Sequence, residues 1–284
     1  MLEKLKLHLR YLQLLPSNVA RLAQAQDHLL AVQREQLRLE LLKQPRYQDP
    51  KRLIRYESQT FSQHGSDGIL VEIFRRIGTT NQMFVEMGCG AGIENNTAYF
   101  LTCGGWNGVW FDGSETEIAR AKQNFRSAIA EKRLSVHQAF ITRENIAGLL
   151  REQKVPKSFD LLSLDIDRNT AYLLDALEEF QPRVMMIEYN AAFPAHQNWR
   201  VQYDGQKVWN STNYFGGSLK NLEETASALG YHLVGCDLDG NDAFFVRKEL
   251  TGDLFCAPFT AENHYEEPKL YLTRHLGHPS CFED

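Results

Sequence analysis

A run of glycines behind an acidic residue is the strongest chemical pattern in this chain of 284 residues. Residues 84–92 read FVEMGCGAG, with Glu86 ahead of Gly88, Gly90 and Gly92. Glycines after a strand let the backbone approach a ligand closely, because no Cβ blocks the way. The run lacks both the G-x-G-x-x-G of a dinucleotide site and the lysine of a P-loop. Because Glu86 would repel a phosphate, the loop favours a ligand with a cationic amino-acid part.

An acid follows at the end of the next strand-like run, GVWFDG. Asp112 is placed there to accept hydrogen bonds from ribose hydroxyls, as in nucleoside-binding α/β folds. A nucleoside without pyrophosphate and with a cationic end matches S-adenosylmethionine. The alternative is a purely structural one, in which the glycines form a tight turn and Asp112 caps a helix beginning at Ser114.

Further acids end two later strand-like runs, at Asp165 and Asp167 in DLLSLDID and at Glu188 in RVMMIEYN. Open α/β sheets bind ligands beyond the carboxyl ends of their strands. Methyl transfer to a hydroxyl requires alignment and a proton acceptor. Asp165, Glu188 and, in the next loop, His196 are therefore the candidate catalytic residues, although a lone loop histidine is commonly just solvated.

Two mechanisms compete at these acids. In one, a carboxylate or His196 acts as the general base. In the other, Asp165 and Glu188, with Asn190, hold Mg²⁺, which lowers the pKa of the acceptor hydroxyl. We favour the metal-free mechanism, because carboxylates at strand ends are expected without any metal.

Residues 199–218 are aromatic, polar and glycine-rich. Such side chains commonly hold polar ring compounds such as sugars, so we predict that this loop forms the wall of an acceptor site. The alternative is a surface loop whose aromatic rings are tucked into the core. The predicted acceptor-binding residues are Asn190, Trp199, Arg200, Tyr203, Trp209 and Tyr214.

The elements that position these residues alternate between strand-like and helix-like segments over about residues 51–250. This alternation predicts an α/β fold with a parallel sheet covered by helices on both faces. The series ends in YHLVGCDL and AFFVRKEL, joined through Asp239-Gly240, which predicts a hairpin and an antiparallel last strand.

Three zones are expected along the chain. Residues 1–50 form a helical extension, with a break at Pro16 and an amphipathic helix from Val19 onward that packs on its own domain, mediates a homodimer or forms a lid. Residues 51–250 form the sheet domain. Residues 251–284, with Pro258, Pro268 and Pro279, form a tail packed on it.

The composition excludes several classes of protein. The net charge of −5 gives no general attraction to nucleic acid, and no apolar run reaches the roughly 20 residues of a membrane span. The five cysteines, among them Cys281, form no C-x-x-C pair, which is typical of reduced thiols. We expect a cytoplasmic protein.

The motifs FVEMGCGAGIENNTAYFL, GVWFDGSE, FDLLSLDID, MIEYN and NDAFFVR, with SQHGSDGI before the first strand, resemble class I S-adenosylmethionine-dependent methyltransferases of the FkbM-related group. The resemblance covers about residues 57–250. It implies a Rossmann-like seven-stranded sheet with an antiparallel last strand. By the same resemblance, Glu86 and the three glycines hold the methionine portion, Asp112 the ribose, and Ala139 and Phe140 flank the adenine. Asp165 lines the floor between cofactor and acceptor, and Arg168 stands where the family has glycine.

The leading hypothesis is an S-adenosylmethionine-dependent O-methyltransferase that acts on a sugar, a glycan or a sugar-containing small molecule. The acceptor class rests on the resemblance. Some sugar O-methyltransferases of this architecture resemble the metal mechanism, with acids at the corresponding strand ends. The alternative is a non-catalytic methyltransferase-like module assembled through its N-terminal helices.

Overall fold

The computed structural model describes residues 2–272, and only the backbone of residues 2–14, 24, 27 and 270. The chain divides into two compact units, Met1–Gln48 and Asp49–Asp284. Of the predicted tail, residues 273–284, with Pro279 and Cys281, lie outside the described part. Among the described residues no helix is long and apolar enough to cross a membrane.

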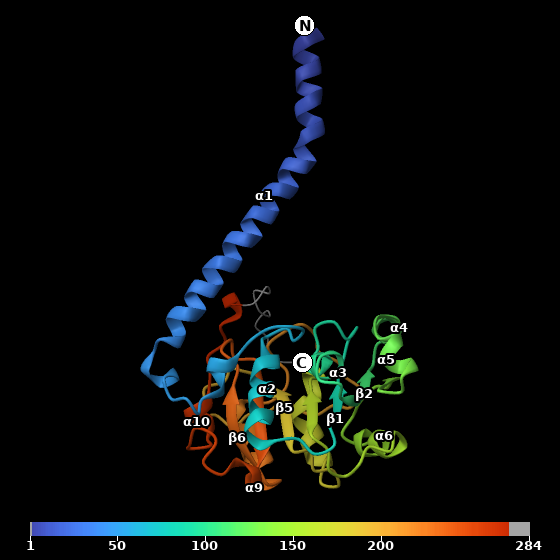
Figure 1. Ribbon diagram of the computed structural model, residues 1–284, viewed down its shortest axis with the longest axis vertical. Helices are drawn as coiled ribbons and strands as arrows, with labels where there is room; N and C mark the ends of the chain where they lie inside the picture. Colours follow the sequence, from blue (N-terminus) through green and yellow to red (C-terminus); the bar gives the residue numbers. More distant parts are fainter. Residues whose placement is uncertain (1, 273–284) are drawn as a thin grey trace. The chain divides into compact units, whose positions relative to one another are not determined.

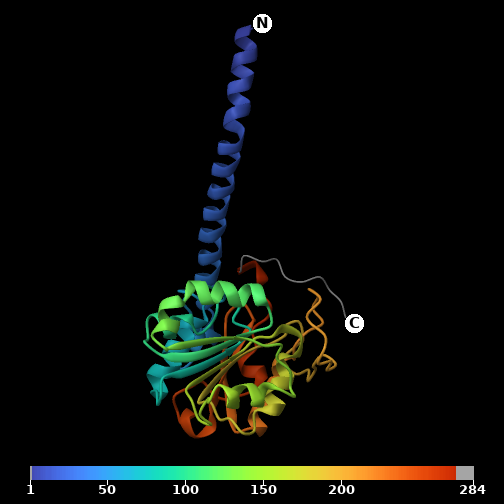
Figure 2. The same cartoon turned by 90° about the vertical axis from the view of Figure 1, so that its right-hand side faces the viewer.

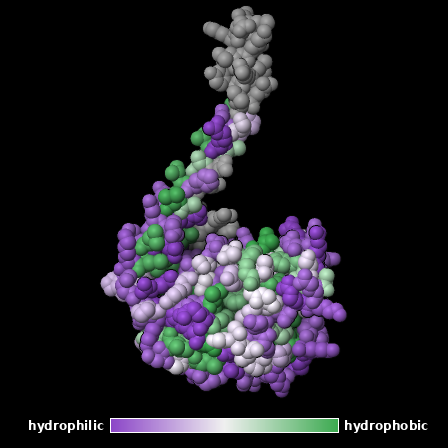
Figure 3. Space-filling view, in the orientation of Figure 1, coloured by the Kyte–Doolittle hydropathy of each residue, from purple (hydrophilic) through white to green (hydrophobic). Residues whose placement is uncertain are grey.

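The first unit consists of helix α1 (Leu2–Leu42) and the short helix η1 (Pro45–Tyr47). The predicted break at Pro16 is wrong, because α1 continues through this proline. A proline removes one backbone hydrogen bond, but long runs of Leu, Gln, Arg, Glu and Ala on both sides favour the helix. Leu22 and Leu29 of α1 are 70% and 64% exposed, and Figure 3 shows hydrophobic side chains along this helix.

The second unit is built on a seven-stranded sheet with the order β3-β2-β1-β4-β5-β7-β6, which confirms the predicted fold class (Figure 1). Neighbouring strands from β3 to β5 are parallel, whereas β7 is antiparallel to both β5 and β6. The strands are β1 (Met83–Met87), β2 (Asn107–Asp112), β3 (Leu134–Gln138), β4 (Leu161–Leu164), β5 (Val184–Glu188), β6 (Tyr231–Cys236) and β7 (Asp242–Arg247).

Helices cover both faces of this sheet (Figure 2). One face packs on α6 (Ile146–Glu152), α7 (Thr170–Leu173) and α8 (Leu219–Ala228). The other face packs on α2 (Ser66–Ile77), α3 (Ala98–Thr102), α4 (Glu115–Asn124) and α5 (Arg126–Ala130). Strand side chains alternate between the two cores, as Phe84 and Val85 of β1 do. The strands are therefore buried on both sides, which explains their nearly continuous apolar sequences.

The predicted hairpin joins β6 to β7, but its connection is longer than a two-residue turn. Gly240 has φ of 79°, and residues 237–241 lie between the two strands. Beyond β7 follow α9 (Lys248–Thr251), α10 (Ala261–His264) and the short helix η5 (Leu270–Leu272). Short helices η2 (Leu53–Tyr56), η3 (Asp167–Asn169) and η4 (Leu174–Ala176) complete the elements. The described cysteines, Cys89, Cys103, Cys236 and Cys256, form no disulfide.

Candidate functional site

The glycine loop begins where β1 ends, and its first glycine is required by its surroundings. Gly88 has φ of 88°, and a Cβ on it would lie 1.7 Å from the backbone oxygen of Asp165. Its N–H and that of Cys89 both donate to the Phe111 carbonyl, at 2.8 and 3.2 Å. Gly90 has φ of 50°, but a Cβ there would meet nothing within 4 Å. The loop is therefore tight against β2 and β4 at Gly88 and opens at Gly90.

Glu86 points from β1 toward the segment that leads into α3. Its carboxylate accepts hydrogen bonds from the Asn95 side chain at 2.7 Å, from the Asn96 backbone at 2.8 Å and from the Thr97 hydroxyl at 2.5 Å. Burial raises the pKa of Glu86 to about 7, against the effect of these hydrogen bonds. Glu86 thus fixes the segment 95–97 while it also lines the pocket described below.

Asp112 lies at the end of β2 and holds two backbone segments together. One carboxylate oxygen accepts from the Gly90 N–H and the other from the Ser114 N–H, both at 2.8 Å. Ser114 in turn caps α4. The carbonyl of Asp112 accepts from Ala139, and the adjacent Phe140 is 48% exposed at the carboxyl end of β3. Asp112 therefore has a structural role, but the cap of α4 is Ser114 and not Asp112, as the structural alternative had it; each carboxylate oxygen of Asp112 keeps a lone pair for a further donor.

A pocket of about 340 Å³ lies against the glycine loop and the ends of β1 and β4. Its wall is strongly acidic, because five of the lining residues are carboxylic acids and two are basic, His64 and Arg120. Arg120 is paired with Glu117 at 2.9 Å. A pocket of this charge favours a cationic ligand. The lining acids are Glu86, Glu94, Glu117, Asp165 and Asp242.

Three acids meet at the ends of β4 and β5. Carboxylate oxygens of Asp165, Asp167 and Glu188 lie within 4.8 Å of one another. Asp165 and Glu188 are partly buried and hydrogen-bonded to each other, whereas Asp167 is exposed. Burial, together with the neighbouring acids, raises the pKa of Asp165 to about 7 and that of Glu188 well above its usual value. The two groups therefore share a proton near neutral pH, as closely spaced carboxyl groups do.

Asn190 and His196, two other predicted site residues, lie apart from these acids. The amide of Asn190 donates to the carbonyls of Asn213 and Phe215, at 2.8 and 3.0 Å, and its oxygen accepts from the Ala192 N–H. His196 is exposed in the loop after β5 and is not among the residues that line the pocket. Asn190 therefore fixes the aromatic loop, and both functional assignments stay predictions.

The aromatic loop is packed largely through its own rings. Trp199 stacks on Phe193 with centroids 4.0 Å apart, and Tyr214 meets Trp199 edge to face at 5.7 Å. The Trp209 indole donates to the Thr212 carbonyl. Of the predicted acceptor-binding residues, none lines the 340 Å³ pocket.

Side chains of this loop attach it to the segments after β3 and after β4. Arg200 pairs with Asp175 at 2.9 Å and lies over the Tyr172 ring, while Tyr203 donates to Glu144. Arg168, where the resemblance has glycine, is 1% exposed, and its guanidinium lies over Tyr214. The larger residue at this position therefore has a packing role under the loop.

Sequence reasoning missed the parts of the site that come from outside the strand ends. His64 and Asp242 line the pocket, and neither was predicted as a site residue. Asp242 was hidden because it begins an antiparallel strand, so that it sits opposite Glu188 at the same edge of the sheet. The motif SQHGSDGI pointed to the segment of His64 without assigning it a role.

Comparison with solved structures finds similar folds among methyltransferases. Magnesium protoporphyrin IX methyltransferase from Synechocystis, with bound S-adenosylmethionine, shares 12% identity at a TM-score of 0.42, over 65% of this chain and 79% of that one. The N-terminal domain of EvdMO1 with bound S-adenosylhomocysteine shares 15% sequence identity at a TM-score of 0.42, over 66% of this chain and 84% of that one. The methyltransferase domain of bacterial CtHen1 shares 16% at 0.42, over 65% and 97%.

Likeness at this level describes no more than the fold and says nothing of what this chain binds. Neither a family model nor a curated protein sequence matches the chain. The narrower FkbM-related resemblance therefore stays a prediction.

Proposed function

We propose that the chain is an S-adenosylmethionine-dependent O-methyltransferase. The observation that carries this proposal is the acidic pocket beside the glycine loop. A ligand that carries both a sulfonium and an ammonium group is a good electrostatic match for that wall. The open space at Gly90 leaves room for such a ligand to lie against the backbone.

In this proposal the ligand contacts Glu86 and the glycine loop, which line the pocket, and also three residues outside that lining, Asp112, Ala139 and Phe140. Glu86 and the backbone of Gly88, Gly90 and Gly92 hold the methionine portion. Asp112, already fixed by the Gly90 N–H, accepts from the ribose. Ala139 and the half-exposed ring of Phe140 flank the adenine at the neighbouring strand end. S-adenosylmethionine would supply the activated methyl group. The chain has to bind the cofactor and the acceptor, orient them and deprotonate the acceptor hydroxyl.

The proton acceptor in this proposal is the partly buried pair of Asp165 and Glu188. A pair that shares one proton near neutral pH can take a proton from an acceptor hydroxyl, because the pKa of Asp165, about 7, lies close to the working pH. His196, being exposed, is the weaker candidate base.

Mg²⁺ also fits the acid cluster. Glu188 Oε2 is buried and has no hydrogen-bond partner within the described residues, and Asp165, Asp167 and Glu188 supply the oxygen ligands that Mg²⁺ takes. These three residues would hold the ion, which would lower the pKa of an acceptor hydroxyl. We still propose the metal-free mechanism, because the proton shared by Asp165 and Glu188 already offsets part of the repulsion between their carboxylates.

The proposed acceptor is a sugar, a glycan or a sugar-containing small molecule. The loop 199–218 supports this class through its rings and amides, several of which are partly exposed, such as Trp199 and Tyr214. Aromatic faces with nearby hydrogen-bonding groups are suited to polar rings. Asn190 supports that wall from beneath.

Calorimetry with S-adenosylmethionine and S-adenosylhomocysteine tests the proposal. We expect micromolar binding by the wild type and a loss of at least tenfold in Asp112→Ala. Arg120→Ala is the matched control, since this exposed side chain lines the same pocket but is already paired with Glu117. Absence of binding by a folded wild-type protein would overturn the proposal.

The second candidate function is a non-catalytic module assembled through its N-terminal helix. The exposed leucines of α1 favour it, because an isolated amphipathic helix gains stability by burying its apolar side chains against a partner. A homodimer through α1 is compatible with both functions. Assembly without any binding of S-adenosylmethionine favours the module.

A further inference from the structure

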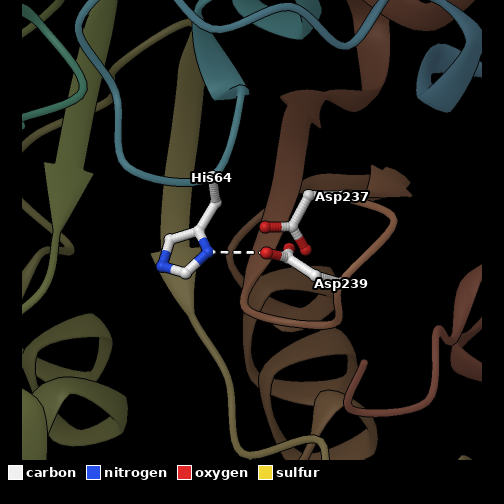
Figure 4. Close-up of side chains that lie close together, drawn as sticks. All are labelled: His64, Asp237 and Asp239. Carbon is white, nitrogen blue, oxygen red and sulfur yellow. Dashed lines mark hydrogen bonds and ion pairs between the residues drawn. The ribbon is translucent and has the colours of Figure 1, made fainter. Parts of the chain in front are cut away.

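A second group of buried polar side chains lies beside the pocket, outside the acids assigned above. His64 comes from the segment before α2, whereas Asp237 and Asp239 come from the connection between β6 and β7 (Figure 4). His64 Nδ1 lies 2.8 Å from Asp239 Oδ2. One nitrogen or oxygen atom of each residue lies within 4.8 Å of those of the other two.

Two oxygens of this group lack a donor. Asp237 is fully buried and Asp239 is 6% exposed, yet Asp237 Oδ2 and Asp239 Oδ1 have no hydrogen-bond partner in the described part of the chain. A buried carboxylate oxygen without a donor or cation is costly. Figure 4 shows the carboxylates of Asp237 and Asp239 close together on the same side of the His64 imidazole, with the dashed line joining the ring to Asp239.

The backbone fixes these groups from outside. Asp237 Oδ1 accepts from the N–H groups of Asn241 and Asp242, at 2.8 and 3.0 Å, which directs its second oxygen toward Asp239. On the other side, Asp67 Oδ2 accepts three backbone N–H groups of residues 60–62, which orders the segment that carries His64. Such orienting contacts are typical of groups that bind a ligand in one geometry.

Further acids lie near this group, since Asp242 and Glu57 act electrostatically on Asp237. The backbone N–H of Lys269 donates to the Asp239 carbonyl at 2.8 Å, but its side chain points elsewhere, because its Nζ donates to Glu266 at 2.9 Å and to the Leu238 carbonyl at 3.1 Å. The single imidazole therefore faces an excess of carboxylates.

We propose that His64, Asp237 and Asp239 form a binding site for one divalent metal ion of the zinc class. One imidazole nitrogen and two carboxylates suit a borderline ion such as Zn²⁺, whereas the all-oxygen set of Asp165, Asp167 and Glu188 suits Mg²⁺. The ion replaces the proton between His64 and Asp239 and supplies the missing partner of both unpaired oxygens. It links the segment before α2 to the β6–β7 connection, independently of the proposed methyltransferase activity.

Calorimetry on full-length protein, stripped with EDTA and dialysed, tests this site. We expect one Zn²⁺ per chain, and at least a tenfold loss of affinity in His64→Ala and in Asp239→Asn. His232→Ala is the matched control, since this partly buried histidine on β6 contacts Thr251 rather than the cluster. Glu188→Gln is expected to weaken Mg²⁺ binding and to leave Zn²⁺ binding intact.

Anomalous scattering from crystals of the wild type soaked in Zn²⁺ needs no variant. A peak between His64 and Asp239 supports the site. A peak confined to the Asp165 cluster or to cysteines, or no Zn²⁺ binding at all, overturns the proposal, as does wild-type affinity in His64→Ala.

Discussion

Replacing single glycines of the loop tests the geometry on which the site depends. Alanine at Gly88 and at Gly90 meets the same backbone problem, because both have positive φ. A left-handed conformation costs an L-residue about 1–2 kcal/mol. Only at Gly88 does the new Cβ also meet a backbone atom, the Asp165 oxygen, at 1.7 Å. A backbone carbonyl cannot turn aside as a side chain can.

These differences translate into measurable stabilities. Gly90→Ala should lower the Tm by about 2–8 °C, at about 2–4 °C for each kcal/mol in a unit of this size. In Gly88→Ala, overpacking adds about 1–3 kcal/mol or more to this cost, so the fall in Tm should be roughly twice that of Gly90→Ala. Gly105→Ala, with φ of 70° and open space around it, is the control remote from the pocket.

Thermal and urea unfolding, followed by calorimetry with S-adenosylmethionine, provide the assay. Gly90→Ala should keep the fold but lose affinity, because Gly90 lines the pocket, whereas Gly105→Ala should lose stability alone. If Gly88→Ala unfolded no more readily than Gly90→Ala, the contact between the loop and the end of β4 would be wrongly described.

Three further predictions follow from charged groups. Burial alone would raise the pKa of Asp160, but hydrogen bonds from Thr80 and Gln82 and the Arg183 ion pair lower it. Asp160→Asn should therefore lower the free energy of unfolding, measured in urea, by about 3–5 kcal/mol at pH 7. The difference from the wild type should shrink as the pH falls below 3.8, and a difference that grew in acid would contradict this account. Because the pKa of Glu188 is raised, wild-type stability should fall as the pH rises above 4.5, so Glu188→Gln should have a higher Tm than the wild type at pH 8 and an equal Tm near pH 4. An unchanged Tm difference between these pH values would show that the Asp165 pair is not strained. Methyl transfer to a panel of sugars at 25 °C should survive EDTA, and activity that returned only with Mg²⁺ would favour the metal-assisted mechanism.

The sheet was predictable because its sequence signals are local. Short apolar runs ending in an acid or glycine mark buried parallel strands, and Asp239-Gly240 marks the hairpin. The break predicted at Pro16 was wrong, because this proline lies inside a long run of helix-forming residues. The carboxyl ends of β1, β2, β4 and β5 likewise placed Glu86, Asp112, Asp165 and Glu188 correctly at one edge of the sheet.

The remaining site residues depend on long-range contacts that spacing cannot reveal. His64 approaches Asp239 across 175 positions of the chain, and only the folded sheet shows that proximity. The amide of Asn190 could have pointed to a ligand or to its own loop, and only the contacts with Asn213 and Phe215 decide this. Electrostatic coupling between Asp165 and Glu188 likewise needs the distance between adjacent strands.

The reversed direction of β7 affects the order in which a growing chain acquires this site. Asp242, at the amino end of β7, lines the pocket. This part of the pocket wall therefore forms only after a residue synthesised long after Gly88 has been added. A ribosome-bound intermediate that ends before β7 holds the glycine loop and the paired acids without that wall. Such an intermediate should leave β5 as an uncovered edge, available for pairing with other nascent polypeptides.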